Sequence, residues 1–257
     1  MPEPAQIQAR RLPARHGFLW LLASFRLFRA NPALITALTM AYVFVIVAVN
    51  LLPYVGPFLL PLALPALIVV LANGCRAVER GGGIGGVALT YGVRQHRVPL
   101  VRLGGLHLLG SIVILAASTI MEGGPPTLAG PPSMDEAETI AAMGRLMIIA
   151  IPVIAAFWFA PLLTAWDEVP PLKSVFFSFV ASWRNWRAFA VFGATAALFA
   201  IGAPGVLLIG AGAVSAGLVS ALAVVLKMAL IFVMAPIMMA SVYVSYQDVF
   251  HGEPAGE

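Results

Sequence analysis

The chain has 257 residues, of which 61% are hydrophobic and only 10% are charged. The charged residues are 15 basic and 11 acidic side chains. About 25% of the residues of a soluble domain are charged, so this composition excludes an ordinary soluble globular protein and predicts a polytopic membrane protein. The net charge of +4 does not indicate a nucleic-acid partner, because arginines at membrane borders normally report topology.

The first part of the chain predicts a tail, a surface helix and two membrane spans. Residues 1–16 are polar and are expected to be an uncleaved cytoplasmic tail. Over 17–30, apolar side chains recur at helical spacing beside two arginines, which predicts an amphipathic helix lying on the membrane. An Asn-Pro pair ends this helix. The apolar runs at 33–52 and 58–73, joined by a short uncharged link, predict the first helical hairpin.

The middle part repeats this order with a long polar loop. The glycine-rich run at 81–86 follows a membrane span and lacks the Gly-Lys-Ser/Thr ending of a phosphate loop, so we interpret it as a hinge. A second surface segment is expected at 87–97. The third and fourth spans are expected at 103–121 and 145–166, and the acidic, proline-rich loop at 122–142 joins them.

The last part contains a third surface segment and the third hairpin. An acidic turn with two prolines leads into the surface segment, which is expected at 172–187. The fifth span is expected at 188–209 and the sixth at 213–244, each with a proline near one end. Residues 248–257 are expected to be a second cytoplasmic tail.

An internal repeat connects these parts. Residues 23–30 read ASFRLFRA, and 158 residues later the chain reads ASWRNWRA, with five of eight positions identical. Arg94 and Arg97 keep the same Arg-x-x-Arg spacing between the two copies. The repeat predicts an all-α, polytopic membrane protein with six transmembrane helices, arranged as three repeats of an interfacial amphipathic helix plus a helical hairpin. The single membrane domain is expected over 17–247, in units 17–75, 76–166 and 167–247.

The basic residues predict the orientation of the spans. Thirteen of the 15 fall in segments that the six spans place on one side. They are Arg10, Arg11, Arg15, Arg26, Arg29, Arg76, Arg80, Arg94, Arg97, Arg102, Lys173, Arg184 and Arg187. The expected outer loops carry only Arg145, against four acidic residues. By the positive-inside rule, both termini are expected in the cytoplasm of a bacterium, with the protein in its inner membrane.

Lys227 is the most conspicuous candidate for a functional residue, because it lies near the middle of the sixth span. An ionisable group at that depth marks a functional site by default. Its alignment with Ala216 and Ser220 on one helical face predicts that it borders an internal cavity or groove and does not face lipid, and there it would hold an anionic headgroup or a proton. The alternative is that the lysine extends to the interface or bonds to backbone carbonyls.

The paired arginines are the second set of candidates. Each pair lies three residues apart on a predicted surface helix, so both side chains can reach anionic lipid headgroups. The pairs are Arg26 with Arg29, Arg94 with Arg97, and Arg184 with Arg187. The alternative is that they only anchor the helices and set the topology.

Catalytic, metal and cofactor sites are not predicted. The single cysteine, Cys75, excludes an intrachain disulfide, and the four histidines show no ligand spacing. Asp167 and Glu168 are adjacent and would diverge on a helix, so the sequence does not support a pair of acid–base residues there.

Four stretches resemble a family of six-span proteobacterial inner-membrane proteins to which no activity is assigned. The stretches are 25–32, 74–81, 159–185 and 240–250. The resemblance implies six spans and an inner-membrane location. The order of surface helix and hairpin is also similar to the membrane domain attached to some glycerophosphodiester phosphodiesterases.

Two classes of function follow from these features. The first is a non-enzymatic membrane protein without a cofactor, whose partners are the lipid bilayer, anionic phospholipid and a second membrane protein. The second is a small transporter or permease-like protein that uses Lys227 and the proline-interrupted spans.

The orientation can be tested with an impermeant thiol reagent in intact spheroplasts. A cysteine at Ser133, in the expected outer loop, should react because that loop faces outward, whereas Cys75 should not. Labelling of Cys75 alone would contradict the orientation.

Overall fold

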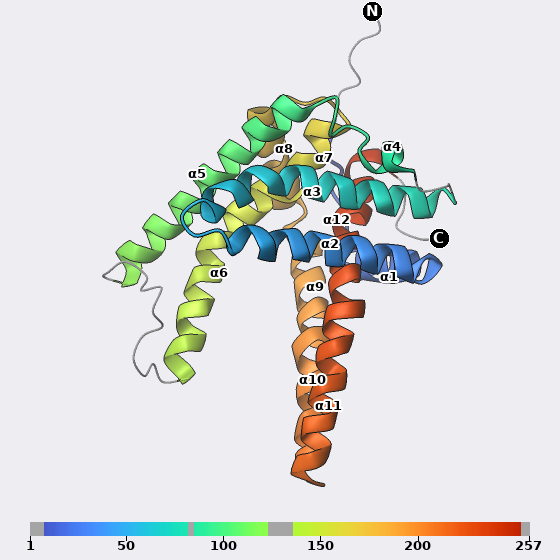
Figure 1. Ribbon diagram of the computed structural model, residues 1–257, viewed down its shortest axis with the longest axis vertical. Helices are drawn as coiled ribbons and strands as arrows, with labels where there is room; N and C mark the ends of the chain where they lie inside the picture. The colour runs from blue at the N-terminus through green and yellow to red at the C-terminus, as the bar shows by residue number, and fades with distance from the viewer. Residues whose placement is uncertain (1–7, 82–84, 123–135, 253–257) are drawn as a thin grey trace, which may run out of the picture.

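The computed structural model describes residues 8–81, 85–122 and 136–252, and the regular structure of these residues is helical (Figure 1). The α-helices are α1 (His16–Ala30), α2 (Pro32–Asn50), α3 (Gly56–Glu79), α4 (Gly86–Leu89), α5 (Arg97–Glu122), α6 (Glu136–Trp158), α7 (Ala160–Ala165), α8 (Pro171–Arg184), α9 (Trp186–Ala197), α10 (Ala203–Gly212), α11 (Ala216–Ala229) and α12 (Ala235–Tyr246). Three π-helical turns join or extend them: η1 (Leu198–Gly202), η2 (Leu230–Met234) and η3 (Gln247–His251). The all-α fold class is confirmed.

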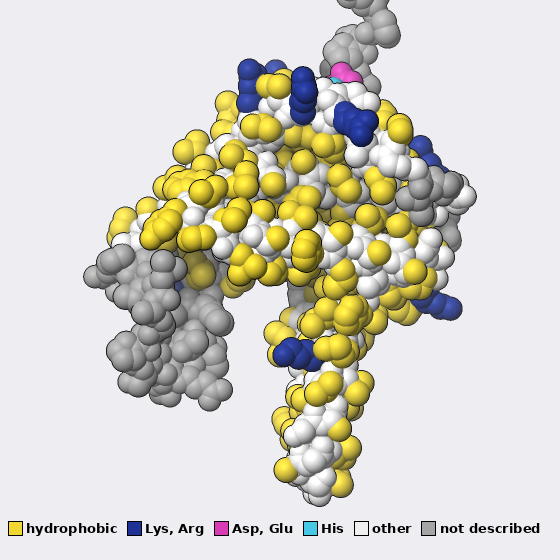
Figure 2. All heavy atoms as spheres, in the orientation of Figure 1, with side chains coloured by type: hydrophobic (Ala, Val, Ile, Leu, Met, Phe, Trp, Pro, Cys, Tyr) yellow, Lys and Arg dark blue, Asp and Glu magenta, His cyan; other side chains and the backbone are white. Residues whose placement is uncertain are grey.

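Six helical stretches are long and apolar enough to cross a membrane, as predicted. They are Pro32–Asn50, Gly56–Glu79, Arg97–Ile120, Gly144–Ala165, Trp186–Gly212 and Ala216–His251. Many of their large apolar side chains are exposed, including Phe44, Ile148 and Ile209. Figure 2 shows hydrophobic side chains over the wide body of the molecule and over the projecting limb on the right, whereas most Lys and Arg side chains on this face lie on the wide body. Exposed apolar surface of this extent fits contact with a lipid bilayer.

The three hairpins diverge from a shared base. The α2–α3 and α5–α6 hairpins share a packing surface between α3 and α5, while α10 and α11 pack chiefly against each other and project away from the rest (Figure 1). At the α3–α5 crossing, a Cβ built on Gly104 would lie 2.6 Å from the Leu62 Cα, so the two backbones approach closely. The base therefore holds the hairpins together, and their tips are separate.

The surface segments pack in a circular order at this base. The first, α1, packs against α9 and α12 of the last hairpin. The chain around α4 packs against α3 of the first hairpin, and α8 packs against α6 of the second. Each segment thus contacts the hairpin of the preceding part of the chain, and the first contacts the last.

Two of the three segments predicted to be surface helices are helical, and their place on the membrane surface stays a prediction. Helix α1 ends before Pro32 and α8 ends at Asn185, so neither continues unbroken into its span. The prediction of a surface helix over 87–97 was wrong, because α4 ends at Leu89, residues 90–96 form turns, and α5 begins at Arg97. Gly92 adopts a positive φ of 75° and is buried against the Ala165 carbonyl, a conformation that ends a helix.

Prolines in the last hairpin are accommodated by wider turns and do not break the helices. Turn η1 precedes Pro204 and η2 precedes Pro236, so each proline follows a π-helical turn. A π-turn leaves carbonyl groups without their usual partner in the helix. The Phe232 carbonyl, in η2, accepts a hydrogen bond of 3.3 Å from the Thr36 hydroxyl of α2.

The segments expected as free tails are partly packed into the domain. The Arg10 amide donates to the Val249 carbonyl at 2.9 Å, and the Leu12 amide donates to Asn185 Oδ1 at 2.8 Å. Residues 1–7 and 253–257, the loop cysteine position Ser133 and most of the outer loop lie outside the described residues. Cys75 is 1% exposed, so its failure to react would not report the side of the membrane.

The close contact of α1 with α9 predicts an intolerant glycine. A Cβ on Gly17 would lie 2.0 Å from the Ala188 carbonyl oxygen and 2.6 Å from the Phe192 nitrogen. We expect Gly17→Ala to lower the stability of the purified protein by about 1–3 kcal/mol through overpacking. Thermal unfolding in detergent, followed by size-exclusion chromatography, measures this loss.

Gly193→Ala is the matched control, because nothing lies within 4 Å of its added Cβ on the neighbouring face of α9. This variant should be neutral or more stable by up to about 1 kcal/mol, since alanine favours a helix. Equal behaviour of the two variants would contradict the close packing of α1 on α9.

Candidate functional site

A polar pocket of about 430 Å³ lies at the base, where α3 and η3 end. Pockets that bind small ligands fall in the range of about 300–1,000 Å³. Side chains from four separate stretches line it: Arg76, Glu79, Arg80, Tyr91, Trp166, Asp167, Tyr243, Gln247 and His251. Two cations and two carboxylates therefore share one cavity in a protein that has very few charges.

Arg76 is held in this pocket by aromatic rings. Its guanidinium carbon lies 5.2 Å from the centroid of the Trp166 ring and 5.8 Å from that of Tyr91, within range of cation–π attraction. The side chain is half-buried, and its Nε is buried without a hydrogen-bond partner. Within the described part of the chain, Arg76 forms no ion pair. A partly buried cation without a carboxylate partner favours an anionic ligand.

The two carboxylates are fixed by tyrosines of α12. Tyr243 donates its hydroxyl hydrogen bond to Glu79 Oε2, and Tyr246 donates to Asp167 Oδ2. Gln247 Nε2 donates to the Tyr243 hydroxyl at 3.3 Å, which continues the network along the same helix. Each carboxylate therefore has one oxygen engaged by a phenol, which fixes its direction.

Asn73 builds the wall that carries Tyr91 and Trp166. Its Nδ2 donates to the carbonyls of Leu89 and Tyr91 at 2.9 and 2.8 Å, and its Oδ1 accepts from Trp166 Nε1 at 3.1 Å. One buried side chain on α3 thus connects the segment after α4 and the end of α7. Both aromatic partners of Arg76 owe their positions to this amide.

The charged groups of opposite sign do not neutralise one another. In the residues that the structure describes, neither Arg76 nor Arg80 comes within 4.0 Å of a carboxylate oxygen. His251 Nε2 lies 3.7 Å from Asp167 Oδ1 and is the only basic group of the pocket so close to an acid among these residues. The pocket therefore offers unpaired positive and negative groups to a ligand, and it can bind a charged ligand by non-covalent contacts.

The residues that the sequence singled out lie outside this pocket. All six paired arginines, Arg26, Arg29, Arg94, Arg97, Arg184 and Arg187, are exposed. Two of them stack on neighbouring rings, with Arg29 5.9 Å from the Phe25 centroid and Arg187 5.6 Å from that of Trp186. Their role as lipid contacts stays a prediction.

Lys227 lines none of the pockets described here, and its place beside an internal cavity or groove stays a prediction. It is exposed on α11, in the hairpin that projects from the base. Its neighbours Leu226, Ala229 and Leu230 instead line an apolar pocket of about 450 Å³ between this hairpin and α1. Helical spacing can assign Lys227 to the same face of α11 as Ala216 and Ser220. It cannot show which helix packs there, and α10, the main neighbour of α11, leaves Lys227 exposed.

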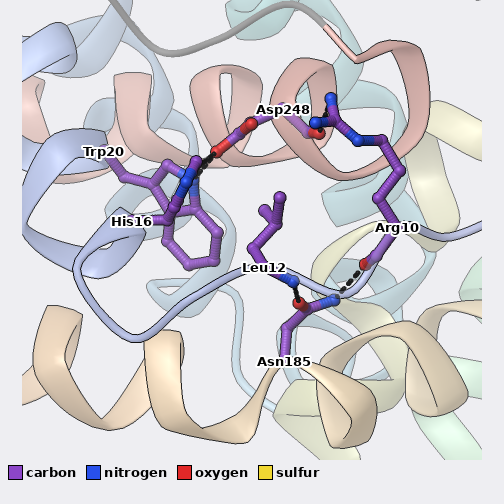
Figure 3. A network of polar contacts seen from close by, with 6 residues as sticks. All are labelled: Arg10, Leu12, His16, Trp20, Asn185 and Asp248. Atoms are coloured by element: carbon purple, nitrogen blue, oxygen red, sulfur yellow. Dashed lines mark hydrogen bonds and ion pairs between the residues drawn. The ribbon is translucent and has the colours of Figure 1, made fainter.

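A second polar network joins the N-terminal segment to the end of the chain (Figure 3). Asp248, 1% exposed, accepts hydrogen bonds of 2.7 Å from His16 Nδ1 and Trp20 Nε1 on one oxygen. Asn185 accepts from the Leu12 amide and donates to the Arg10 carbonyl at 2.9 Å. These groups fill the space between three segments and border no described pocket, so we interpret the network as structural.

Comparison with known proteins identifies the family. No family model and no solved structure matches the chain. A protein of Burkholderia thailandensis, named a probable inner membrane protein, is 31% identical over 267 residues, which cover 97% of this chain and 96% of the relative. The chain belongs to the family of this inner membrane protein. With its six apolar helices, it is an integral membrane protein.

Sequence reasoning missed the pocket of this inner-membrane protein because its residues are distant in the chain. One signal was present. Three of the four stretches that resemble the inner-membrane family, 74–81, 159–185 and 240–250, each contribute side chains to the pocket. The similarity in layout to the phosphodiesterase membrane domain stays a prediction.

Loss of the Asn73 amide should destabilise the pocket. Asn73→Ala leaves two carbonyls and one indole N–H without partners, so we expect the protein to lose about 1–3 kcal/mol of stability. Asn50→Ala is the control, because the Asn50 amide donates only to Ile46 of its own helix at an exposed site. Thermal unfolding in detergent should separate the two variants, and equal melting temperatures would contradict the proposed role of Asn73.

Proposed function

We propose that this inner-membrane protein binds a phospholipid headgroup in the polar pocket and does not catalyse a reaction. The observation that carries the proposal is Arg76, a half-buried guanidinium held between two aromatic rings without an ion-pair partner in the described chain. A phosphate group offers the oxygen acceptors that a guanidinium recognises. Arg80 lines the same pocket and supplies a second cation.

The position of the pocket supports a lipid as the source of the phosphate. The pocket lies at the ends of α3 and η3, which are also the ends of two membrane spans. Headgroups occupy this level of a bilayer, while acyl chains lie between the spans. The described residues nearest the two ends of the chain, such as Arg10 and Val249, also lie at the base, which fits the shared side that the positive-inside rule predicts for them.

Binding without catalysis fits the residues of the pocket. Among the described side chains that line it there is no Ser, Thr or Cys to act as a nucleophile. Both carboxylates are engaged by tyrosine hydroxyls, which suits fixed binding groups. The transporter alternative depended on Lys227 beside a cavity, and its exposed position on α11 does not favour that alternative.

Native mass spectrometry of the purified protein in detergent, with added phospholipid, tests the proposal. We expect Arg76→Gln to weaken retention of phospholipid by about tenfold or more, because charge-assisted hydrogen bonds contribute about 1.5–3 kcal/mol. Arg76→Lys should retain more phospholipid than Arg76→Gln because lysine keeps the positive charge. It should retain less than the wild type because lysine lacks the planar fork of N–H donors.

Arg187→Gln is the matched control. Arg187 also stacks on a tryptophan, but it is exposed and lines no pocket described above. Its substitution should leave retention unchanged. If Arg187→Gln lowered retention as much as Arg76→Gln, general surface charge would explain the binding and the pocket would not.

A further inference from the structure

We propose that the pocket selects a zwitterionic headgroup that carries a phosphate diester and a primary ammonium, as in phosphatidylethanolamine. This inference rests on the proposed function and names the ligand class of the same site. Arg76 and Arg80 contact the phosphate, and Glu79 and Asp167 contact the ammonium.

The charged groups of the pocket are balanced. Two guanidinium groups and two carboxylates line the same cavity, so their formal charges sum to zero with His251 neutral. A ligand with only negative charge would be attracted by the arginines and repelled by the carboxylates. A ligand with both charges can place each beside a group of opposite sign, so the pocket favours a zwitterion.

The arginines and the carboxylates of the pocket do not pair with one another. Aromatic rings from the chain after α4 and after α7 hold Arg76, while tyrosines of α12 hold the carboxylates. Arg76, Glu79 and Arg80 all lie at the end of α3, yet no arginine–carboxylate ion pair forms within 4.0 Å in the described residues. A ligand that carries both charges would satisfy the arginines and the carboxylates at once.

The negative side suits an ammonium with N–H donors. One oxygen of each carboxylate accepts from a tyrosine; the second oxygen of Asp167 lies 3.7 Å from His251 Nε2, and the second oxygen of Glu79 has no hydrogen bond among the described residues. The ends of α3 and η3 also point their carbonyl-rich C-termini to this region, which favours a positive charge there. A primary ammonium offers three donors, whereas a quaternary ammonium offers none, so the pocket should discriminate between ethanolamine and choline headgroups.

The test compares lipids with identical dioleoyl chains and different headgroups on the full chain in detergent. Native mass spectrometry should show phosphatidylethanolamine retained about tenfold or more above phosphatidylglycerol and phosphatidylcholine. Glycerophosphoethanolamine, which has no acyl chains, should compete only weakly. If it competed as well as the lipid, the ligand would be a soluble zwitterion and the assignment to a lipid would be wrong.

Acid-to-amide variants examine the ammonium side directly. Glu79→Gln combined with Asp167→Asn keeps an acceptor for each tyrosine but removes both negative charges. This double variant should lose the preference for phosphatidylethanolamine and bind phosphatidylglycerol at least as well. Glu168→Gln, an exposed acid next to Asp167 but outside the pocket, should keep the wild-type preference.

The possible failures are distinguishable. If phospholipids bind in an Arg76-dependent way but without preference, and the double variant changes nothing, the zwitterion assignment is wrong while the proposed function stands. If retention does not depend on Arg76 for any of the lipids, both the assignment and the proposed function are wrong.

Discussion

The side-chain amide of Asn73 connects three segments that are distant in the sequence. It satisfies two carbonyls of the chain after α4 and the indole of Trp166, so the turns around Tyr91 are fixed on the end of α3. Unpaired buried carbonyls are costly, and this non-helical segment has few partners of its own. The aromatic walls around Arg76 follow from that constraint, and so does the shape of the pocket. Asn185 acts similarly on the N-terminal segment.

The spans could be predicted because each depends only on the local length of an apolar run. The turns at 90–96 could not be predicted. The spacing of Arg94 and Arg97 fits turns as well as a helix, and the contact of Gly92 with Ala165 joins residues that are distant in the chain. The same limit applied to Lys227. Periodicity assigned it to a helical face, but only the packing shows that no neighbouring helix covers that face.

The arginines of this protein fall into two chemical environments that look alike in the sequence. The paired arginines are exposed. Arg76 was counted with them for topology, but the fold places it between Tyr91 and Trp166, which are 15 and 90 residues further along the chain. A positive charge that is partly desolvated attracts an anion more strongly than one in water. For Arg76, the environment that the fold creates, and not the charge count, is what distinguishes it from the paired arginines.

The pocket lies where the three hairpins meet. Its cations come from the end of α3, Asp167 from the turn after α7, and Tyr243 from α12. Because the hairpins diverge, contacts among all three parts exist only at the base. A ligand that bridges the walls of this pocket would contact each part, and its binding energy would add to the packing that holds the base together. Occupation of the pocket would therefore stabilise the assembly of the three hairpins.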